Sequence, residues 1–363
     1  MIMIIIHEYG EPSHYIGATK VAELYNTRLS YYEFSTLKLI FSGVKKRNQK
    51  FILKAIRDFF LLFSFFLFPR LLKGETVIIG IAPIDYRVFF FNRILKYSHV
   101  IYHTSWTKWD GSKYPKQYSF NKKLILKWWS FFLKHRVNSF AVVTETVKQQ
   151  LVDNFNIDKS KIVVVYHSYE SSTFNVKTKN KNDKLKAIFV GRLVKEKGVD
   201  DLLAIAKINS EVEFIIVGEG PLSEHVKIEA REISNVNVYN FIKDKNKLAD
   251  LYRESTFILL PSKRTPFWEE LFGMVLIEAM ACGCIPLCTD HNGPSIILGH
   301  STLKINVFSE DEYIQSVNAS FKKYQNQPHL LVEDRINAIA IAQKYSKESI
   351  ADFWAAVIKL AKE

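Results

Sequence analysis

The sequence predicts an α/β fold built from two doubly wound parallel sheets. Short apolar runs alternate with amphipathic stretches along both halves of the chain, as strands and helices do in such folds. A polar, lysine-rich stretch over residues 173–186 separates the two series and is typical of a linker. At 363 residues the chain is long enough for two domains, and we place their boundary near residue 175.

The first half begins with an apolar run of the kind found in a buried parallel strand. The expected elements are a helix over Ala18–Leu24 and strands over Ile2–Ile6, Val77–Ile81, Val100–Tyr102, Ala141–Val143 and Ile162–Tyr166. His103 directly follows a strand, at the carboxyl end where such sheets bind ligands. Gly17 precedes the helix, where a glycine allows backbone to approach a ligand. A structural histidine and a plain turn are the ordinary alternatives.

The second half repeats the alternation. We expect strands over Ala187–Val190, Glu213–Val217, Val236–Phe241 and Phe257–Leu260, and helices over Val199–Lys207 and Lys247–Tyr252. Beyond residue 293 only helical sequence is expected. The Gly218-Glu219-Gly220 run lacks the third glycine and the downstream acidic residue of a dinucleotide site, so it is a weak signal.

The most informative stretch is Pro261–Gly293, PSKRTPFWEELFGMVLIEAMACGCIPLCTDHNG. It follows an apolar strand, passes through a polar and aromatic loop, and enters a helix at Phe272-Gly273. Two carboxylates, Glu270 and Glu278, flank that entrance. A helix N-terminus presents unpaired amides and a favourable dipole, so this arrangement predicts a phosphate site.

Charge is distributed unevenly along the chain. Residues 1–180 hold 27 Lys and Arg against 12 Asp and Glu, whereas the remainder hold 23 against 25. A strongly basic half suits an anionic partner, either a membrane surface or a nucleic acid.

Two segments of the basic half, residues 45–73 and 122–136, interleave Lys and Arg with aromatic residues. As helices they resemble amphipathic surfaces that lie in a bilayer interface, and an ordinary core helix is the alternative. No nucleic-acid-binding motif accompanies them, so we expect an anionic membrane surface and no nucleic acid as partner.

Several classes of site and segment are excluded or disfavoured. Cys282, Cys284 and Cys288 lack a second Cys/His pair nearby, so we expect buried thiols rather than a metal site. The opening MIMIIIHEYG lacks a basic leader and resembles a strand, and the run Phe59–Phe68 is too short to span a bilayer. These features favour a cytoplasmic protein that contacts the inner face of the membrane peripherally.

An ordered series of motifs in the second half resembles the retaining nucleotide-sugar glycosyltransferases of family 4, which have the two-domain GT-B fold. The series comprises Gly191-Arg192…Lys197-Gly198, Val217-Gly218-Glu219-Gly220-Pro221-Leu222, Pro261-Ser262, Glu270-Leu271-Phe272-Gly273, Ile277-Glu278-Ala279-Met280-Ala281, Gly283-Cys284-Ile285-Pro286 and Gly293. The resemblance is firm over residues 140–300 and thinner before them. It implies a nucleotide-sugar domain over 176–344 and a last helix, 345–363, that crosses back to the acceptor-binding domain over 1–175.

The resemblance also implies roles for individual residues. Arg192 and Lys197 would supply cations to the donor diphosphate, and the amides of Gly273, Met274 and Val275, next to Phe272, would cradle it. Glu278 would accept hydrogen bonds from the ribose, and Glu270 would face the donor sugar's hydroxyls. His103 would face the same sugar, and Gly17 would lie near the donor.

The resemblance implies neither a metal nor a cofactor, because a GT-B enzyme stabilises the leaving diphosphate with cations and helix amides. It also implies no dedicated nucleophile, because the family is understood to react by front-side attack. The single glycine at residue 17, where relatives have a pair, and the aromatic loop with Phe267 and Trp268 leave the donor sugar open.

The expected function is transfer of a hexose from a UDP- or GDP-sugar to a lipid-linked saccharide in bacterial surface polysaccharide assembly, such as O-antigen of lipopolysaccharide or capsule. Two alternatives stay open. A GT-B sugar-nucleotide epimerase would use the same donor site without an acceptor, and a non-catalytic membrane or nucleic-acid binding protein would not need the donor residues.

Overall fold

The computed structural model describes residues 2–8, 15–45, 47–112, 114–116, 121–177, 184–266 and 268–363. The chain forms two compact units: unit 1 contains residues 1–167 and 348–363, and unit 2 contains residues 168–347. The first division, at residue 167, lies eight residues before the expected boundary at 175. The second, at residue 347, lies three residues after the expected end of the second domain at 344. Phe267 and residues 178–183 of the expected linker lie outside the described residues.

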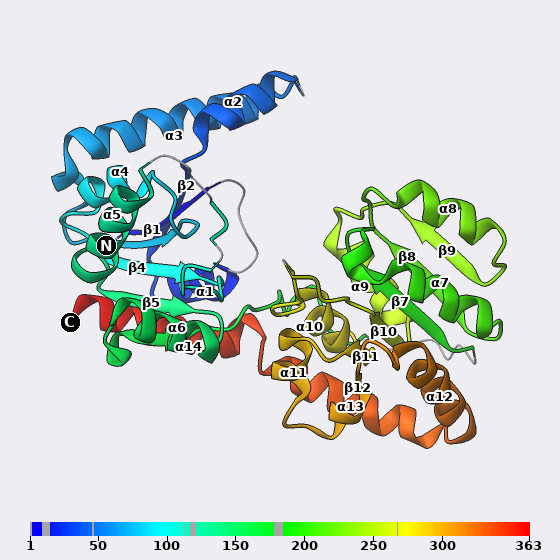
Figure 1. The fold of residues 1–363 in the computed structure, drawn as a ribbon. Coiled ribbons are helices and arrows are strands. Elements are labelled where there is room, and N and C mark those ends of the chain that lie inside the picture. The colour runs from blue at the N-terminus through cyan, green and yellow to red at the C-terminus, as the bar shows by residue number, and fades with distance from the viewer. Residues whose placement is uncertain are drawn as a thin grey trace. The chain divides into compact units, whose positions relative to one another are not determined.

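Unit 1 is a parallel six-stranded sheet covered by helices on both faces (Figure 1). Its strands are β1 (Ile2–His7), β2 (Arg28–Glu33), β3 (Thr76–Gly80), β4 (His99–Thr104), β5 (Ser139–Val142) and β6 (Ile162–Val164). Its helices are α1 (Ile16–Leu24), α2 (Thr36–Lys45), α3 (Gln49–Leu67), α4 (Val88–Ile94), α5 (Lys122–His135), α6 (Glu145–Phe155) and α14 (Lys347–Lys362). The strand order is β2-β1-β3-β4-β5-β6.

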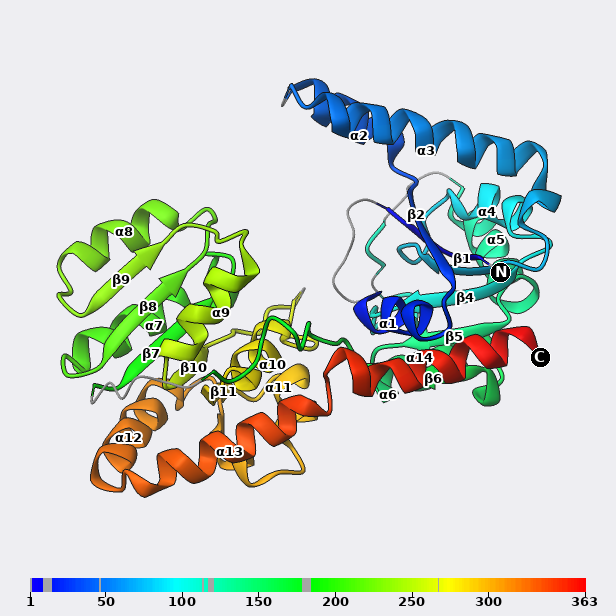
Figure 2. The same cartoon turned by 180° about the vertical axis from the view of Figure 1, so that it is seen from behind.

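Successive side chains along each strand point to opposite faces of this sheet, so a separate hydrophobic core forms on each face. Ile4 and Ile6 of β1 pack with side chains from α3, α4, α5 and α6. Met3 and Ile5 point to the other face and pack with α1 and α14. Figure 2 shows α14 lying along unit 1 with β5 and β6, so the last helix joins the first domain as expected.

Unit 2 is a second parallel six-stranded sheet, with the order β12-β11-β10-β7-β8-β9. Its strands are β7 (Lys186–Val190), β8 (Glu213–Val217), β9 (Val236–Tyr239), β10 (Phe257–Leu260), β11 (Ile285–Thr289) and β12 (Val307–Phe308). Its helices are α7 (Val199–Ile208), α8 (Ser223–Arg231), α9 (Lys245–Glu254), α10 (Met274–Ala281), α11 (Asn292–Leu298), α12 (Tyr313–Asn326) and α13 (His329–Gln343). The predicted fold class is confirmed.

Some element predictions were wrong. We expected only helices beyond residue 293, but β12 lies there. We also did not predict β11, which lies within Pro261–Gly293. β11 contains Pro286, which is tolerated because β12 pairs only with Cys288 and Thr289, further along the strand. β2 was missed because it is an edge strand whose side chains are mostly half-buried and polar.

The two basic aromatic segments form helices, but their aromatic side chains differ in exposure. In α3, Phe59, Phe60 and Phe63 are exposed, whereas Phe65 is buried. In α5, Trp129 and Phe132 are fully buried in the core. Within residues 122–136, Trp129 and Phe132 therefore belong to an ordinary core helix face and not to a membrane-contacting surface. Among the described residues no helix has the length and apolarity that crossing a membrane requires.

Glycine permits a close backbone approach between two loops of unit 2. Gly198 has φ +66°, and a Cβ there would lie 1.8 Å from the carbonyl oxygen of Pro261. The loops after β7 and β10 consequently pack backbone to backbone. Gly74 in unit 1 has a similar φ of +75° but nothing within 4 Å of such a Cβ.

These two glycines define a matched test. We expect Gly74→Ala to cost about 1–2 kcal/mol from left-handed backbone strain alone. Gly198→Ala should cost more, about 2–5 kcal/mol, because the two loops must also separate. Chemical denaturation followed by circular dichroism measures both costs, and equal losses would show that the close approach contributes nothing.

Candidate functional site

The candidate site of unit 2 lies where its strand order reverses. β7 is followed in space by β8 and β9 on one side and by β10, β11 and β12 on the other. In parallel sheets, ligands bind outside the carboxyl ends of the strands at such a point. The loops that follow β7 and β10, residues 191–198 and 261–273, both begin there.

The loop after β8 packs against the same region. A Cβ on Gly218 would lie 1.8 Å from the carbonyl oxygen of Gly191, so only glycine fits. The amide of Leu193 donates to the carbonyl of Glu219 at 3.0 Å. The Gly218-Glu219-Gly220 run therefore has a packing role at this edge of the sheet.

Lys197 and Glu270, which are 73 residues apart in sequence, meet in this site. The Lys197 ammonium donates to Oε2 of Glu270, and the two side chains are only 20% and 13% exposed. The hydroxyl of Ser262 lies 3.4 Å from the same oxygen, and the ring of Trp268 has its centre 4.8 Å from the ammonium. The structure thus brings together one predicted cation and one predicted carboxylate.

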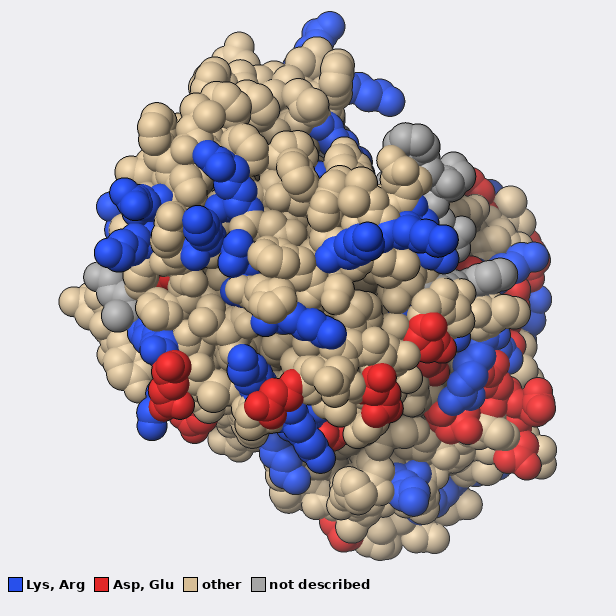
Figure 3. Space-filling model, turned by 60° about the vertical axis from the view of Figure 1, so that its left-hand side comes forward, with Lys and Arg blue, Asp and Glu red and all other residues tan. Residues whose placement is uncertain are grey.

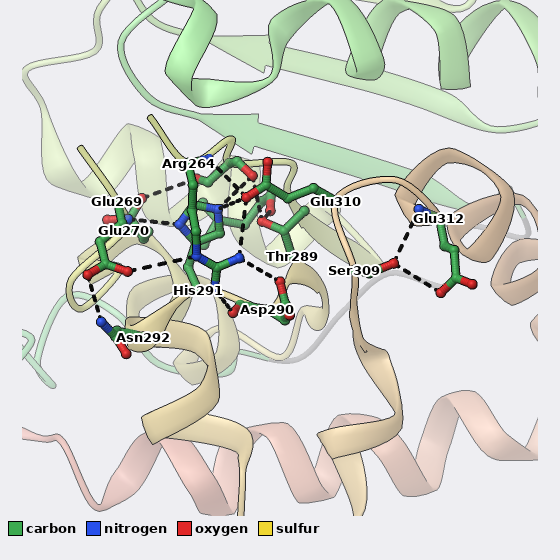
Figure 4. Close-up of polar contacts among 12 residues, drawn as sticks. Arg264, Glu269, Glu270, Thr289, Asp290, His291, Asn292, Ser309, Glu310 and Glu312 are labelled. Carbon is green, nitrogen blue, oxygen red and sulfur yellow. Dashed lines mark hydrogen bonds and ion pairs between the residues drawn. The ribbon is translucent and has the colours of Figure 1, made fainter. Parts of the chain in front are cut away.

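His291 holds the backbone of Glu270 in place (Figure 4). The amide of Glu270 donates to Nδ1 of His291 at 3.0 Å, and Nε2 lies 2.8 Å from the carbonyl of Ser262. Nδ1 accepts and Nε2 donates, so the ring is neutral and a single tautomer fits both bonds. Burial and the nearby Arg264 lower the pKa of His291, in agreement with this state.

An ionic network lies beside His291. Nη1 of Arg264 lies 3.0 Å from Oδ1 of Asp290 and 3.3 Å from Oε1 of Glu310. Glu269 accepts a hydrogen bond from Asn292 at 2.8 Å. Figure 4 shows these side chains gathered around His291 and Glu270, so the loop that carries the predicted carboxylate is tied to two neighbouring segments, residues 290–292 and Glu310.

Helix α10 presents an uncapped N-terminus at the predicted phosphate site. Gly273, with φ +79°, precedes the helix and offers no side-chain cap, and the first turn contains no acidic residue. The amide of Leu276 donates to the carbonyl of Gly273 at 2.9 Å. The amides of Met274 and Val275 precede that bond and donate to no other described residue. Amides in this position at a helix N-terminus bind anions. The ring of the buried Phe272 lies against Tyr345, with centroids 5.6 Å apart.

Glu278 lies in the second turn of α10. Desolvation by the surrounding chain raises its pKa to about 7, and the charge of Lys245 opposes that rise. No other described residue forms a hydrogen bond or ion pair with its carboxylate. A carboxylate with these properties is suited to accept hydrogen bonds from a ligand.

Arg192, in the loop after β7, is exposed, and its guanidinium has no partner among the residues that the structure describes. Arg192 and Lys197 both lie in the loop after β7, but their side chains differ. That of Arg192 is exposed to solvent, whereas that of Lys197 forms an ion pair with Glu270.

The two predicted site residues of unit 1 are buried. His103 lies in β4, and its ring centroid is 5.0 Å from that of Tyr15 and 5.8 Å from that of Trp354. Gly17 lies inside α1, not in a loop, and a Cβ there would meet Trp354 at 2.7 Å. Close packing against α14 thus accounts for this glycine, and its role near the donor stays a prediction.

Sequence reasoning missed His291, Arg264 and Glu310. His291 comes two residues after β11, so recognising that strand would have placed a histidine at a carboxyl strand end. The cysteines are buried and free, as predicted. In the described part of the chain no group of three or more His, Cys, Asp or Glu is arranged to hold a metal ion.

Comparison with solved structures identifies the fold. The Anabaena HepE protein in complex with UDP matches 99% of this chain and 100% of its own, with a TM-score of 0.67 and 14% identity. At this identity the likeness shows the architecture alone, which is GT-B.

The sequence of unit 2 resembles a known family. Residues 171–344, just under half of the chain, match the model of glycosyl transferases group 1. An uncharacterised protein of the cps region in Klebsiella pneumoniae is 34% identical over 137 residues, which cover 35% of this chain and 36% of that protein.

A further relative is a Campylobacter jejuni protein named N-acetylgalactosamine-N,N'-diacetylbacillosaminyl-diphospho-undecaprenol 4-alpha-N-acetylgalactosaminyltransferase. It is 25% identical over 194 residues, which cover 52% of this chain and 49% of that enzyme. The chain thus aligns with about a third to a half of the length of these two curated relatives.

The neutral His291 predicts a specific pattern of mutant stabilities. His291→Leu leaves the amide of Glu270 and the carbonyl of Ser262 unpaired, and should cost about 2–4 kcal/mol in the free energy of unfolding of unit 2. His291→Gln keeps an amide that can replace one of the two bonds and should cost about half as much. Urea unfolding measures both, and a loss that is the same for the two variants would contradict the bonding role.

Proposed function

We propose that the protein is a retaining glycosyltransferase that moves a hexose from a UDP- or GDP-sugar to a lipid-linked saccharide. The observation that carries the proposal is the meeting of Lys197 and Glu270 beside the uncapped N-terminus of α10, in a unit that matches the model of glycosyl transferases group 1. This combination offers cations and amides for a diphosphate together with a carboxylate for sugar hydroxyls.

In this proposal the donor diphosphate binds at α10. The amides of Met274 and Val275 donate to its oxygens, and Arg192 and Lys197 neutralise the charge that develops as it leaves. Lys197 then lies between the phosphate and Glu270. Glu270 accepts hydrogen bonds from the donor sugar, while Glu278 accepts them from the ribose. The role of His103 stays what the family resemblance implies.

The transfer itself needs no residue as nucleophile. An acceptor hydroxyl oxygen forms a bond to the anomeric carbon while the bond from that carbon to the diphosphate oxygen breaks. The hydroxyl proton moves to the departing phosphate on the same face, so the anomeric configuration is retained. The chain's own contribution is to orient the donor and to stabilise the leaving group without a metal ion.

The acceptor and the location rest on other observations. The Campylobacter relative acts, by its name, on a diphospho-undecaprenol saccharide, and the Klebsiella relative comes from a cps region. Unit 1 exposes Phe41 of α2 and Phe60 of α3, which suit a bilayer interface beside many Lys and Arg side chains. We therefore place the enzyme in the cytoplasm, at the inner face of the membrane, in the assembly of a surface polysaccharide.

The donor site is tested by removing one charge at a time. Lys197→Met and Glu270→Gln should each lower kcat/KM about 100-fold or more, because each removes a preorganised interaction with the leaving group or the sugar. Transfer is measured with a panel of UDP- and GDP-sugars and a lipid-linked acceptor.

The neighbouring Lys195 is exposed and provides the control, since Lys195→Met removes the same charge two residues away. Its activity should stay near that of the wild type. Full activity of both Lys197→Met and Glu270→Gln would refute the site. Turnover of a donor without any acceptor would instead favour an epimerase.

The raised pKa of Glu278 predicts how donor affinity depends on pH. Ribose hydroxyls donate best to the ionised carboxylate, so affinity for an intact sugar nucleotide should rise about tenfold from pH 6 to pH 8. Glu278→Gln should bind the donor more weakly and with little pH dependence. Calorimetric titrations at several pH values measure this, and an equal slope in both proteins would rule out Glu278.

A second consequence concerns the protein without ligand. Because the folded-state pKa of Glu278 lies above the ordinary glutamate value, the carboxyl stabilises unit 2 fully only at low pH. That contribution is lost as the pH rises through about 7, and Glu278→Gln should remove this part of the pH dependence.

A further inference from the structure

A groove of about 680 Å³ lies in unit 1. One wall is formed by Phe59, Phe63 and Phe66 of α3, and the other by Phe90 and Phe91 of α4. Its volume is typical of a site for a small molecule, and such sites combine an apolar lining with a few polar groups.

The polar groups of this groove gather at one end. Glu8 directly follows β1, Ser35 follows β2, and Arg87 lies in the segment after β3. Nη2 of Arg87 donates to Oε1 of Glu8 at 2.9 Å, and Nη1 donates to the Ser35 hydroxyl at 2.7 Å. Lys116 lies 3.2 Å from the same Glu8 oxygen.

This polar end coincides with the point where the strand order of unit 1 reverses. The order β2-β1-β3 places the carboxyl ends of β1 and β3 side by side, which is the ligand-binding position of an open parallel sheet. The groove therefore runs from this position outward between α3 and α4.

The polar end carries two cationic side chains, Arg87 and Lys116, and Lys38 is a third cation in the lining of the groove. The carboxylate among the described lining residues is Glu8, and Asp85 pairs with Arg87 at 2.5 Å. Lys and Arg side chains bind anionic groups through charge-assisted hydrogen bonds.

The apolar part of the groove is continuous with the exposed face of α3. Phe59 and Phe63 line the groove and are still 42% and 49% exposed, and the neighbouring Phe60 is 60% exposed without lining it. In the upper part of Figure 3 the surface is mostly uncharged. Lys and Arg side chains are scattered over it, and few acidic side chains are seen there. An apolar chain can thus enter the groove sideways from a bilayer in which this face lies.

We propose that the groove binds the lipid phosphate of the acceptor. The long apolar chain lies between α3 and α4, and the phosphate lies at the polar end with Arg87 and Lys116. This inference rests on the proposed function, and it assigns to the acceptor a site made by unit 1 alone.

The test uses farnesyl phosphate as the probe and titrates it into the full chain, followed by calorimetry. We expect it to bind, farnesol to bind at least tenfold more weakly, and inorganic phosphate not to bind measurably. Lys116→Ala should reduce the preference for farnesyl phosphate over farnesol. Phe63→Asp places a carboxylate in the groove and should weaken farnesyl phosphate binding at least tenfold.

Phe60→Asp is the matched control, because it adds the same charge one turn away on an exposed position outside the groove. It should leave binding of the probe unchanged. An equal loss in both variants would overturn the proposal, since general surface hydrophobicity would then explain binding. Failure of the wild type to bind the probe would also overturn it.

Binding of the sugar nucleotide, measured on the same variants, separates this inference from the proposed function. Intact donor binding in Phe63→Asp, with unchanged circular dichroism, shows that the variant is folded and that unit 2 is unaffected. If neither the wild type nor the variants bind farnesyl phosphate but all of them bind the sugar nucleotide, only the proposal for the groove is overturned. If the wild type binds no sugar nucleotide, the proposed function is overturned.

Discussion

The site in unit 2 depends on how closely three loops pack at the carboxyl end of its sheet. Gly198 lies against the carbonyl of Pro261, and Gly218 lies against the carbonyl of Gly191. Any side chain at these positions would force the loops after β7, β8 and β10 apart. The contact between Lys197 and Glu270 requires that spacing, because each residue comes from a different loop. The ion pair between Lys197 and Glu270 thus depends on the backbone packing of these loops.

Both units place their polar groups at the same topological position, although their strand orders differ. In unit 2 the reversal lies between β7 and β10 and gathers Lys197, Glu270 and the start of α10. In unit 1 it lies between β1 and β3 and gathers Glu8 and Arg87. The first group lies beside a helix N-terminus, and the second lies at the end of an apolar groove. A polar diphosphate ligand and an amphiphilic ligand fit these two environments respectively.

The sequence allowed much of the fold and part of the site to be predicted. Strongly apolar runs such as Phe257–Leu260 were found because they are buried on both faces. β2 and β12 were not, since one is a polar edge strand and the other has two residues. Lys197 and Glu270 were singled out from their motif, but their pairing depends on β7 and β10 being neighbours. His291 was not predicted because it follows β11, a strand that was missed. Periodicity alone also did not distinguish the buried Trp129 from the exposed Phe60.

Helix α14 belongs to the core of unit 1, although unit 2 separates it from the rest of that unit in sequence. Trp354 fills the space left by Gly17, so the first helix of the chain has its packing partner more than 300 residues later. During synthesis, unit 2 can reach its full set of contacts before α14 emerges from the ribosome, whereas unit 1 cannot. The second unit is therefore expected to fold first, and the first unit to close only when the last helix arrives.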